Sequence, residues 1–452
     1  MLAILYPRET KIAKKCISVN WLKNIFPYAK FVFLDTASPA FSHLPEKILV
    51  SCHFENNYPY ILQILEREGI KIKRNERKGK PKIFLGGPVA VNPFPLYEFI
   101  DVFFIGDFST EVVKKVIEEN AENEHVFIPG KKEYASVSDE RELLYYAFCE
   151  GELHVEVQCG CRNRCLFCLL GWTKKLAYCD VKAACEVVSI LKPEKVFLIG
   201  SDIFAHREIE KIVSFVKSAG IELSFPSSRL SEIVEYLHLI KEISPKTFTI
   251  APESSERIRR ALNKRFSNEE ILQVAELLKQ VGVKKLKLYF ILGLPGEREE
   301  DMDEIVALIK KLRKIMQVSA TFSIFVPKPH TPMQFAPFQN IRELERKNKL
   351  MKKWISKLTV KAHFTNPKKA FIQMLLSIGG KNISKLLARV YARGLNYSSW
   401  IKEAKRLGID LKKYSEEKGF DYEFDFECIN TGVSKKALWK IYQNYKKRVE
   451  SL

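Results

Sequence analysis

VEVQCGCRNRCLFCLLGW, residues 155–172, places three cysteines, Cys161, Cys165 and Cys168, in the spacing CxxxCxxC. Three thiolates on one short loop can hold a metal centre. A closed structural zinc site needs four ligands, usually as two separated pairs, and no second CxxC or CxxH pair follows downstream. A [4Fe-4S] cluster has four irons, so three cysteines would leave one iron open for chemistry.

The cysteine motif directly follows a β-run and carries an aromatic residue, Phe167, before its last cysteine. This pattern resembles the radical S-adenosylmethionine (SAM) superfamily. The resemblance implies that the open iron binds the amino and carboxylate groups of SAM and reduces its sulfonium, which yields a 5′-deoxyadenosyl radical. It also implies an electron donor of the ferredoxin or flavodoxin type. Cys159 is not needed by the family, and it is either a small apolar residue at a strand end or a ligand of zinc or a second cluster.

A chain of 452 residues can form two or three domains, each with a sizeable core. Its ten cysteines fit reduced thiols and a metal site better than a disulfide framework. No run of 18 apolar residues occurs, and the N-terminal MLAILYPRETKIAKK is too short and wrongly flanked for a signal peptide. We therefore expect a cytoplasmic protein without a transmembrane segment.

The formal net charge of +20 is concentrated near the C-terminus, where residues 341–452 hold 26 Lys and Arg against 11 Asp and Glu. Such a basic segment can neutralise the phosphates of RNA or an anionic membrane surface. It can equally be a solvated lysine-rich face, as in proteins from hot habitats. RNA is thus one candidate partner, and the substrate itself is not fixed by any motif.

Residues 1–145 alternate short apolar runs with amphipathic stretches. Helical period is found at 58–67 and 110–119, between five strand-like runs: LAILYP (2–7), FVFLD (31–35), ILVSCHF (48–54), IFLGGP (83–88) and DVFFIGD (101–107). Strands separated by single helices predict a mostly parallel sheet covered on both faces. We therefore expect a Rossmann-like α/β domain.

Glycines lie at the expected carboxyl ends of two of these strands, at Gly86-Gly87 and at Gly106. Ligands bind at such ends in open α/β sheets, although a glycine there also suits a tight turn. The segments 51–70 and 85–107 resemble the N-terminal domain of cobalamin-binding radical SAM proteins, which implies a corrinoid site at these glycines. No DxHxxG motif supplies a histidine to cobalt, and the family's GDGE is here Gly106-Asp107-Phe108-Ser109. The alternative is a degenerate domain that covers the barrel mouth.

Residues 146–360 repeat a strand–helix pattern, with helical period at 209–218, 269–281 and 300–315. The expected strands are 153–157, 195–199, 222–225, 246–250, 284–291 and 320–326. Six such units predict a partial (β/α)6 barrel with its active site at the carboxyl ends of the strands.

The radical SAM resemblance assigns SAM contacts to three of these strand ends. Gly200-Ser201-Asp202 stands where the family often has Gly-Gly-Glu for the methionine amino group. Arg229, in PSSRL, matches a family arginine and could grip the SAM carboxylate bidentately. TIAPESSERIRR (249–260) resembles a family segment in which Glu253 would contact the ribose hydroxyls, although an acid here also suits a helix start.

Two further strand ends carry family-like loops. ILGLPGE (291–297) resembles the turn that packs on adenine, with Gly293 allowing close backbone approach. FVPKPHTPMQF (325–335) resembles a proline-stiffened family loop holding His330 at the barrel mouth. His330 could move a proton or contact substrate, or it could be a hydrogen-bonded strut.

Residues 361–452 read as a basic helical domain with helical period at 368–378, 384–391, 398–407 and 434–448. Its aromatics Tyr391, Tyr397 and Trp400 could stack on RNA bases or build a core. The whole pattern predicts a radical SAM enzyme using a [4Fe-4S] cluster and SAM, with methyl transfer to an unactivated carbon if cobalamin is bound. The alternatives are a tRNA-modifying radical SAM enzyme without cobalamin and a non-catalytic iron–sulfur or zinc protein.

Overall fold

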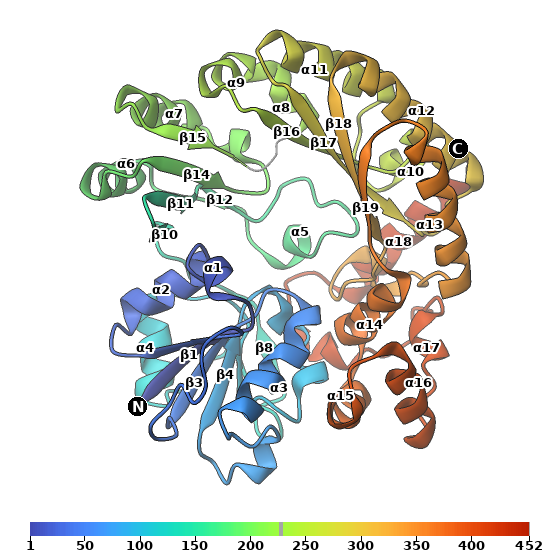
Figure 1. Ribbon diagram of the computed structural model, residues 1–452. Helices are drawn as coiled ribbons and strands as arrows, with labels where there is room; N and C mark the ends of the chain where they lie inside the picture. The colour runs from blue at the N-terminus through green and yellow to red at the C-terminus, as the bar shows by residue number, and fades with distance from the viewer. Residues whose placement is uncertain (226–228, 452) are drawn as a thin grey trace.

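The computed structural model describes residues 1–225 and 229–451, and arranges them as an N-terminal sheet domain, a curved wall of β/α units and a helical tail (Figure 1). The N-terminal domain lies at the bottom of the view and the curved wall at the top. The tail runs down one side and packs against both, so segments far apart in sequence meet in the middle of the molecule.

The N-terminal domain is built on a six-stranded sheet of order β2-β1-β3-β4-β5-β7. Its strands are β1 (Leu2–Tyr6), β2 (Lys30–Phe33), β3 (Lys47–Ser51), β4 (Lys82–Gly86), β5 (Val102–Phe104) and β7 (Val126–Phe127). Only the pairing of β7 with β5 is antiparallel. The strand order reverses between β1 and β3, which is the topological switch point at which doubly wound sheets bind ligands.

Four helices accompany this sheet because their apolar residues recur at helical spacing. They are α1 (Thr10–Ala13), α2 (Ile17–Ile25), α3 (Tyr58–Arg67) and α4 (Thr110–Glu118). Helix α3 buries Ile61, Leu62 and Leu65 in the core of the molecule, whereas α4 buries Val113, Val116 and Ile117 in a second cluster. Two short ladders extend the domain, pairing β6 (Gly106–Asp107) with β9 (Ser138–Asp139) and β20 (Ile429–Asn430) with β8 (Ala135–Ser136). The α/β organisation expected for this part of the chain is therefore present.

The curved wall consists, within the described residues, of two four-stranded sheets of orders β10-β11-β14-β15 and β16-β17-β18-β19. The strands are β10 (Tyr145–Cys149), β11 (Glu152–Glu156), β14 (Lys195–Ile199), β15 (Glu222–Ser224), β16 (Thr247–Glu253), β17 (Lys285–Leu292), β18 (Gln317–Ile324) and β19 (Lys361–Phe364). Neighbouring strands are parallel except β10 and β11. The six expected strands are present, and the wall continues past residue 360 through β19.

Helices cover the outer face of the wall (Figure 1). They are α6 (Val181–Leu191), α7 (Ile209–Ser218), α8 (Leu230–Glu235), α9 (Leu237–Ile243), α10 (Glu256–Ala261), α11 (Asn268–Gln280), α12 (Glu299–Ile315) and α13 (Ile341–Ser356). The inner side holds the cysteine loop and the short helix α5 (Leu169–Thr173), whose stem pairs β12 (Gln158–Cys159) with β13 (Ala177–Tyr178). The wall therefore curves around the cysteines.

The tail contains α14 (Pro367–Ile378), α15 (Lys381–Arg393), α16 (Tyr397–Arg406), α17 (Lys412–Ser415) and α18 (Lys435–Ser451). Its aromatics serve the fold: Trp400 is buried, Tyr391 donates a hydrogen bond to Glu66 and Tyr397 packs edge-on against Phe371. The hypothesis that these rings stack on RNA is therefore wrong for Trp400, which has no exposed face. No helix among the described residues is long and apolar enough to cross a membrane.

Candidate active site

The cysteine loop is held in place by hydrogen bonds from the elements around it. Trp172 donates its indole N–H to the carbonyl of Cys165 over 3.0 Å, and Asn263 donates its side-chain amide to the carbonyl of Asn163 over 2.7 Å. Gly160 has a φ of 67°, and an added Cβ would lie 2.5 Å from the carbonyl oxygen of Lys175. These contacts hold the backbone of the loop in one shape.

The three loop cysteines are free thiols. Burial raises the pKa of Cys165, although the positive charges of Lys264 and Arg229 oppose it. Burial likewise raises the pKa of Cys168. Among the residues that the structure describes, no three Cys, His, Asp or Glu side chains converge on a single metal-ion site. A [4Fe-4S] cluster does not demand such convergence, because each of its irons takes its own thiolate.

A polar cluster lies beside the loop at the end of β14. Asp202 is 1% exposed, and its Oδ2 accepts a hydrogen bond from Asn163 over 3.3 Å and lies 3.8 Å from Nε of Arg229. Arg229 also reaches Cys165, with 3.8 Å from its Nη2 to Sγ. The backbone N–H of Asp202 is held by Gln158 over 2.9 Å. A guanidinium, a carboxylate and a thiol therefore share one corner of the wall.

The end of β16 presents a second buried acid. Glu253 is 7% exposed, has a left-handed φ of 65° and pairs with Nζ of Lys264 over 2.5 Å. Lys264 also donates to the carbonyl of Ala251 over 2.9 Å. The positive charge of Lys264 lowers the pKa of both Cys165 and Cys168. Only the side chain of Lys264 therefore separates Glu253 from these thiols.

A cavity of about 600 Å³ lies between the carboxyl edge of the N-terminal sheet and the cysteine loop. Most of its wall is apolar, from the sheet, α2 and α5. Residues that line it at the loop end include Cys159, Gly160, Gly200 and Ser201, and those at the sheet edge include Ser51, His53, Gly86, Gly87 and Gly106. The cavity thus runs from the carboxyl edge of the sheet to Gly160 and Leu169, which are next in sequence to Cys161 and Cys168.

Charged side chains bridge the two domains at this cavity. Asp107 pairs with both Lys174 and Arg141, and Arg141 also pairs with Glu156. The Cys159 thiol lies 3.8 Å from Asp107, and burial raises its pKa to about 12. Of the roles open to Cys159, its 8% exposure in the cavity wall fits a packed, protonated thiol.

Comparison with known proteins identifies both halves of this site. Residues 155–309 match the model of the radical SAM superfamily, and residues 41–145 match that of the N-terminal domain of radical SAM proteins. The first match begins six residues before Cys161 and includes the corner described above. The chain belongs to the radical SAM superfamily.

Relatives of this radical SAM protein include an uncharacterized protein of Methanocaldococcus jannaschii, 30% identical over 413 residues that cover 85% of this chain and 90% of that protein. The tRNA-2-methylthio-N(6)-dimethylallyladenosine synthase of Anaplasma phagocytophilum is 28% identical over 198 residues, 40% of this chain and 44% of that enzyme. Solved structures include Streptococcus suis SuiB bound to its precursor peptide SuiA, with 12% identity, a TM-score of 0.36 and coverage of 49% of this chain and 50% of that one. The chain therefore spans less than half of the Anaplasma enzyme.

Membership in the superfamily implies a [4Fe-4S] cluster and SAM. The donors fit: three free thiols lie on one loop, and metal binding replaces the protons that burial holds on Cys165 and Cys168. Arg229 lies 3.8 Å from Cys165 and 3.8 Å from Asp202. The radical SAM resemblance predicts that Arg229 and Asp202 contact the carboxylate and amino groups of SAM. Residues 226–228 of the PSSRL motif lie outside the described part of the chain.

Three glycines that the sequence predicts to contact ligands are explained instead by packing within the chain. Gly87 and Gly106 line the cavity, but an added Cβ would lie 2.2 Å from the carbonyl oxygens of Cys52 and Ser138 respectively. An added Cβ at Gly293 would lie 2.6 Å from Leu344 on α13. Close packing within the chain therefore explains these glycines. Gly86 differs, because its Cβ position meets only Phe104 at an ordinary 3.7 Å and faces the cavity.

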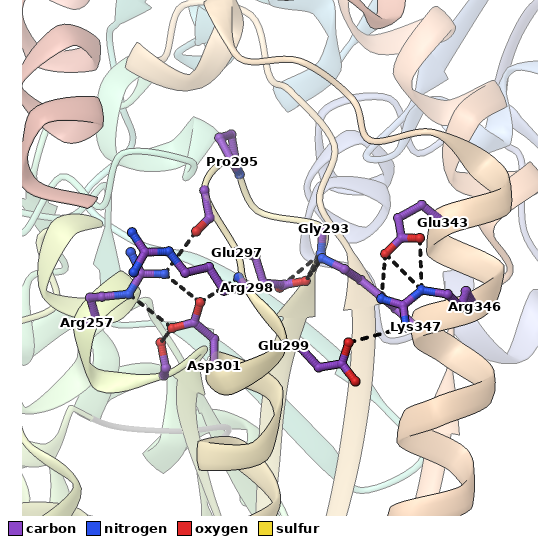
Figure 2. A network of polar contacts seen from close by, with 12 residues as sticks. Arg257, Gly293, Pro295, Glu297, Arg298, Glu299, Asp301, Glu343, Arg346 and Lys347 are labelled. Atoms are coloured by element: carbon purple, nitrogen blue, oxygen red, sulfur yellow. Dashed lines mark hydrogen bonds and ion pairs between the residues drawn. The ribbon is translucent and has the colours of Figure 1, made fainter. Parts of the chain in front are cut away.

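The turn after Gly293 belongs to a polar network between β17, α12 and α13 (Figure 2). Glu297 accepts the N–H of Gly293 over 3.1 Å and pairs with Lys347 over 2.5 Å. Arg257 pairs with Asp301 over 2.6 Å and donates to the carbonyl of Gly296 over 2.9 Å. Arg257 therefore has a structural role in this network.

His330 is a strut between domains, and a catalytic role finds no support in the geometry. Its Nε2 donates to the carbonyl of Val91 over 3.0 Å, its ring packs edge-on against Phe426, and it does not line the cavity. Burial lowers its pKa to about 4, so the ring is neutral near pH 7. The neighbouring Lys328 lines the cavity instead and pairs with Glu55 over 2.6 Å.

Two residues of this site, Glu232 and His53, belong to none of the sequence motifs that predicted functional residues. Glu232 is contacted by Arg162, which follows the first cluster cysteine, but the two lie 70 residues apart in the chain. His53 lines the cavity next to Ser18, whose hydroxyl lies 3.1 Å from its Nε2. The position of His53 just after the third strand run could have suggested a ligand contact. For Glu232, the only indication in the sequence was its position close to Arg229 in the chain.

Proposed function

We propose that this radical SAM enzyme holds a corrinoid in the cavity and transfers a methyl group to an unactivated carbon of its substrate. One observation carries the proposal: the cavity starts at the carboxyl edge of a doubly wound sheet and ends at residues next in sequence to Cys161, Cys168 and Asp202, namely Gly160, Leu169 and Ser201. A flat ligand on the sheet edge would therefore face SAM. A bound corrinoid supplies the methyl-transfer chemistry that the protein side chains lack.

The cavity lining suits such a ligand. Leu49, Phe84 and Phe104 from the sheet and Trp21 from α2 give it an apolar interior, and about 600 Å³ is typical of a small-molecule site. The polar group at the sheet edge is His53, which is hydrogen-bonded to Ser18 and whose pKa burial lowers to about 4. A neutral imidazole adds no buried charge there.

The chain's own residues would orient the reactants and exclude water. Cys161, Cys165 and Cys168 would hold the cluster, and Asp202 and Arg229 would orient the amino acid end of SAM. The Asp107–Lys174 and Glu55–Lys328 pairs tie the N-terminal domain to the loops of the wall, and the residues of both pairs line the cavity. We further propose that an iron–sulfur or flavin electron donor reduces the cluster, and that the enzyme works in the reducing cytoplasm.

Gly86 offers a sharp test of the corrinoid. Its φ is not left-handed and its Cβ direction is open, so Gly86→Leu would fill the cavity without straining the backbone. Protein purified anaerobically with hydroxocobalamin should retain a corrinoid absorption band, and Gly86→Leu should lose it while its iron content is unchanged. The control is Gly419→Leu, at a site with no neighbour within 4 Å. A wild-type protein without the band, or a Gly86→Leu variant that keeps it, refutes the proposal.

A second candidate function is RNA modification without cobalamin, supported by the basic surface of α13. Lys349, Lys352 and Lys353 on this helix and Lys357 at its C-cap are exposed at helical spacing, and none has an acidic partner within 4.0 Å among the described residues. Among the relatives are enzymes whose names identify tRNA as the molecule they modify. A lysine stripe of this kind can contact phosphates.

Salt dependence tests the RNA candidate. If the stripe binds tRNA, the logarithm of the association constant should fall linearly with the logarithm of the salt concentration, and replacing all four lysines by glutamine should flatten that slope by about 3. The control replaces the exposed Lys310, Lys311 and Lys314 of α12. Equal slopes for both variants and the wild type would exclude the stripe as an RNA site.

A further inference from the structure

Two buried carboxyl groups meet beside the cysteine loop. Asp202, after β14, is 1% exposed, and Glu232, on α8, is 7% exposed. Two consecutive residues of the cysteine loop contact them, since Arg162 donates to Glu232 over 3.1 Å and Asn163 donates to Asp202 over 3.3 Å. Within residues 1–225 and 229–451, one oxygen of each, Oδ1 of Asp202 and Oε2 of Glu232, has no hydrogen-bond partner. Buried acceptors are nearly always satisfied, so the described part of the chain leaves this pair without a donor.

The other oxygens of the pair are satisfied by groups from the cysteine loop and the β15–α8 connection. Arg162 contacts Glu232 over 3.1 Å, while Asn163 and Arg229 lie 3.3 and 3.8 Å from Asp202. Burial, and then the hydrogen bond and charge of Asp202, raise the pKa of Glu232 to about 8, against the opposing charge of Arg162. Two adjacent buried carboxylates repel each other, so a donor with a positive charge would stabilise both.

An α-amino acid zwitterion matches this arrangement. Its ammonium group carries three donors and one positive charge, which suits two unsatisfied carboxylate oxygens. Its carboxylate needs a cation a few ångströms away, and the Arg229 guanidinium lies 3.8 Å from Asp202. The same guanidinium reaches Cys165, so both ends of the zwitterion would lie next to the cluster ligands.

We propose that Glu232 joins Asp202 in binding the ammonium group of SAM, and that it supplies the second carboxylate oxygen of that site. The inference rests on SAM being the cosubstrate and does not depend on the corrinoid. Glu232 is a binding residue that the sequence motifs leave unassigned, because it lies 30 residues after the Gly200-Ser201-Asp202 turn. The rival occupant of the pair is a single shared proton.

Equilibrium dialysis of reconstituted protein against three probes separates these cases. Glu232→Gln keeps the shape of the side chain and removes its charge. The variant should raise the Kd for SAM about 10-fold or more, and it should do the same for decarboxylated SAM, which keeps the ammonium group. It should leave the Kd for 5′-methylthioadenosine unchanged, because that probe has neither the ammonium nor the carboxylate group. Glu222→Gln, an exposed acid of the same wall paired with Lys195, is the matched control.

The possible outcomes distinguish this inference from the wider proposal. If Glu232→Gln binds SAM as the wild type does, the pair only shares a proton and the inference is overturned. A Kd that rises equally for all three probes points to a general disturbance of the site and also overturns it. An unchanged iron content in Glu232→Gln verifies that the loop is intact. If only the corrinoid band is absent, the proposed corrinoid function fails and the inference about Glu232 stands. A wild-type protein that fails to bind SAM would contradict both the inference and the proposed function.

Discussion

Burial and charge act in opposite directions on the thiols of the cysteine loop. Burial raises the pKa of Cys165 and Cys168, and Lys264 partly offsets it at both. Without metal these side chains are therefore protonated, and assembly of the cluster has to release protons. Hydrogen bonds from Trp172 and Asn263 hold the backbone of the loop that carries these thiols.

His330 gives a pH-dependent prediction. Its pKa of about 4 in the folded protein lies below the ordinary value of about 6.5, so the unfolded chain binds the proton first as pH falls. The contribution of His330 to stability is thus complete above about pH 6.5 and is lost as pH falls toward 4. His330→Asn tolerates the left-handed φ of 57° and cannot titrate.

The free energy of unfolding of the wild type, relative to His330→Asn, should therefore fall by about 2 kcal/mol between pH 7 and pH 5. Urea unfolding at the two pH values measures this difference. A difference that stays constant would show that the imidazole already carries its proton in the folded protein at pH 5.

At the scale of single residues, the sequence predicts the chemical type of a site better than it predicts which side chains contact one another. The cysteine spacing predicts the cluster ligands, because a local motif fixes their order and distance along the chain. Glu232 could not be found this way, since only the packing of α8 against the loop brings it to Asp202. Gly87 shows the reverse case, because its place at a strand end suggested a ligand while the backbone of Cys52 occupies its Cβ direction.

At the scale of elements, the C-terminal helix α18 is attached to the wall through the turn after β17. Arg257 on α10 pairs with Asp301 (Figure 2). It also donates to the carbonyls of Val449 and Gly296. Tyr445 of α18 donates to the carbonyl of Pro295 over 2.8 Å. The arginine therefore joins three elements, and its side chain is only 13% exposed.

Arg257→Gln should destabilise the protein by about 3 kcal/mol, because it leaves Asp301 buried without its cation and frees two carbonyls. The midpoint of urea unfolding measures this loss. Arg260→Gln is the matched control on the same helix, since its pair with Glu256 is half exposed and should contribute less than about 1 kcal/mol. Equal losses in both variants would contradict a special role for Arg257.

Elements with continuous apolar runs or long helical periods were predicted to within a few residues, as at β14, α3 and α7. Strand β19 was not, because its KAHF is short and alternates exposed and half-buried positions, leaving no apolar run to read. Helix α13 was also missed, since it holds as many lysines and arginines as apolar residues. Pairing with β18 determines the structure of β19, and packing against α14 determines that of α13.

At the scale of the whole molecule, Glu55 links all three parts. It is 4% exposed, pairs with Lys328 of the wall over 2.6 Å and accepts a hydrogen bond from Gln373 of the tail over 3.1 Å. Burial opposes its ionisation, but the charge and hydrogen bond of Lys328 outweigh burial and keep its pKa below the ordinary value. The buried carboxylate of Glu55 thus holds the parts together, and it stays charged because Lys328 from the wall lies beside it.

Lys328→Met should destabilise the protein by about 3 kcal/mol at pH 7, because a buried carboxylate then lacks its cation. The loss should shrink as pH falls, since Glu55 can then take up a proton. Adding Glu55→Gln to the same variant should restore most of the stability. Thermal unfolding of the two single variants and the double variant checks this, and strictly additive losses would mean that the two groups do not interact.

The central claim is that Cys161, Cys165 and Cys168 hold a cluster with one open iron that splits SAM. Anaerobic reconstitution followed by iron analysis and assay of 5′-deoxyadenosine tests it most directly. The wild type should bind about four irons per chain and form the nucleoside from SAM and a reductant, and Cys185→Ala on α6 should do the same. Cys165→Ala should lose both properties. One zinc per chain with no nucleoside, or a Cys165→Ala variant that behaves as the wild type, would contradict the claim.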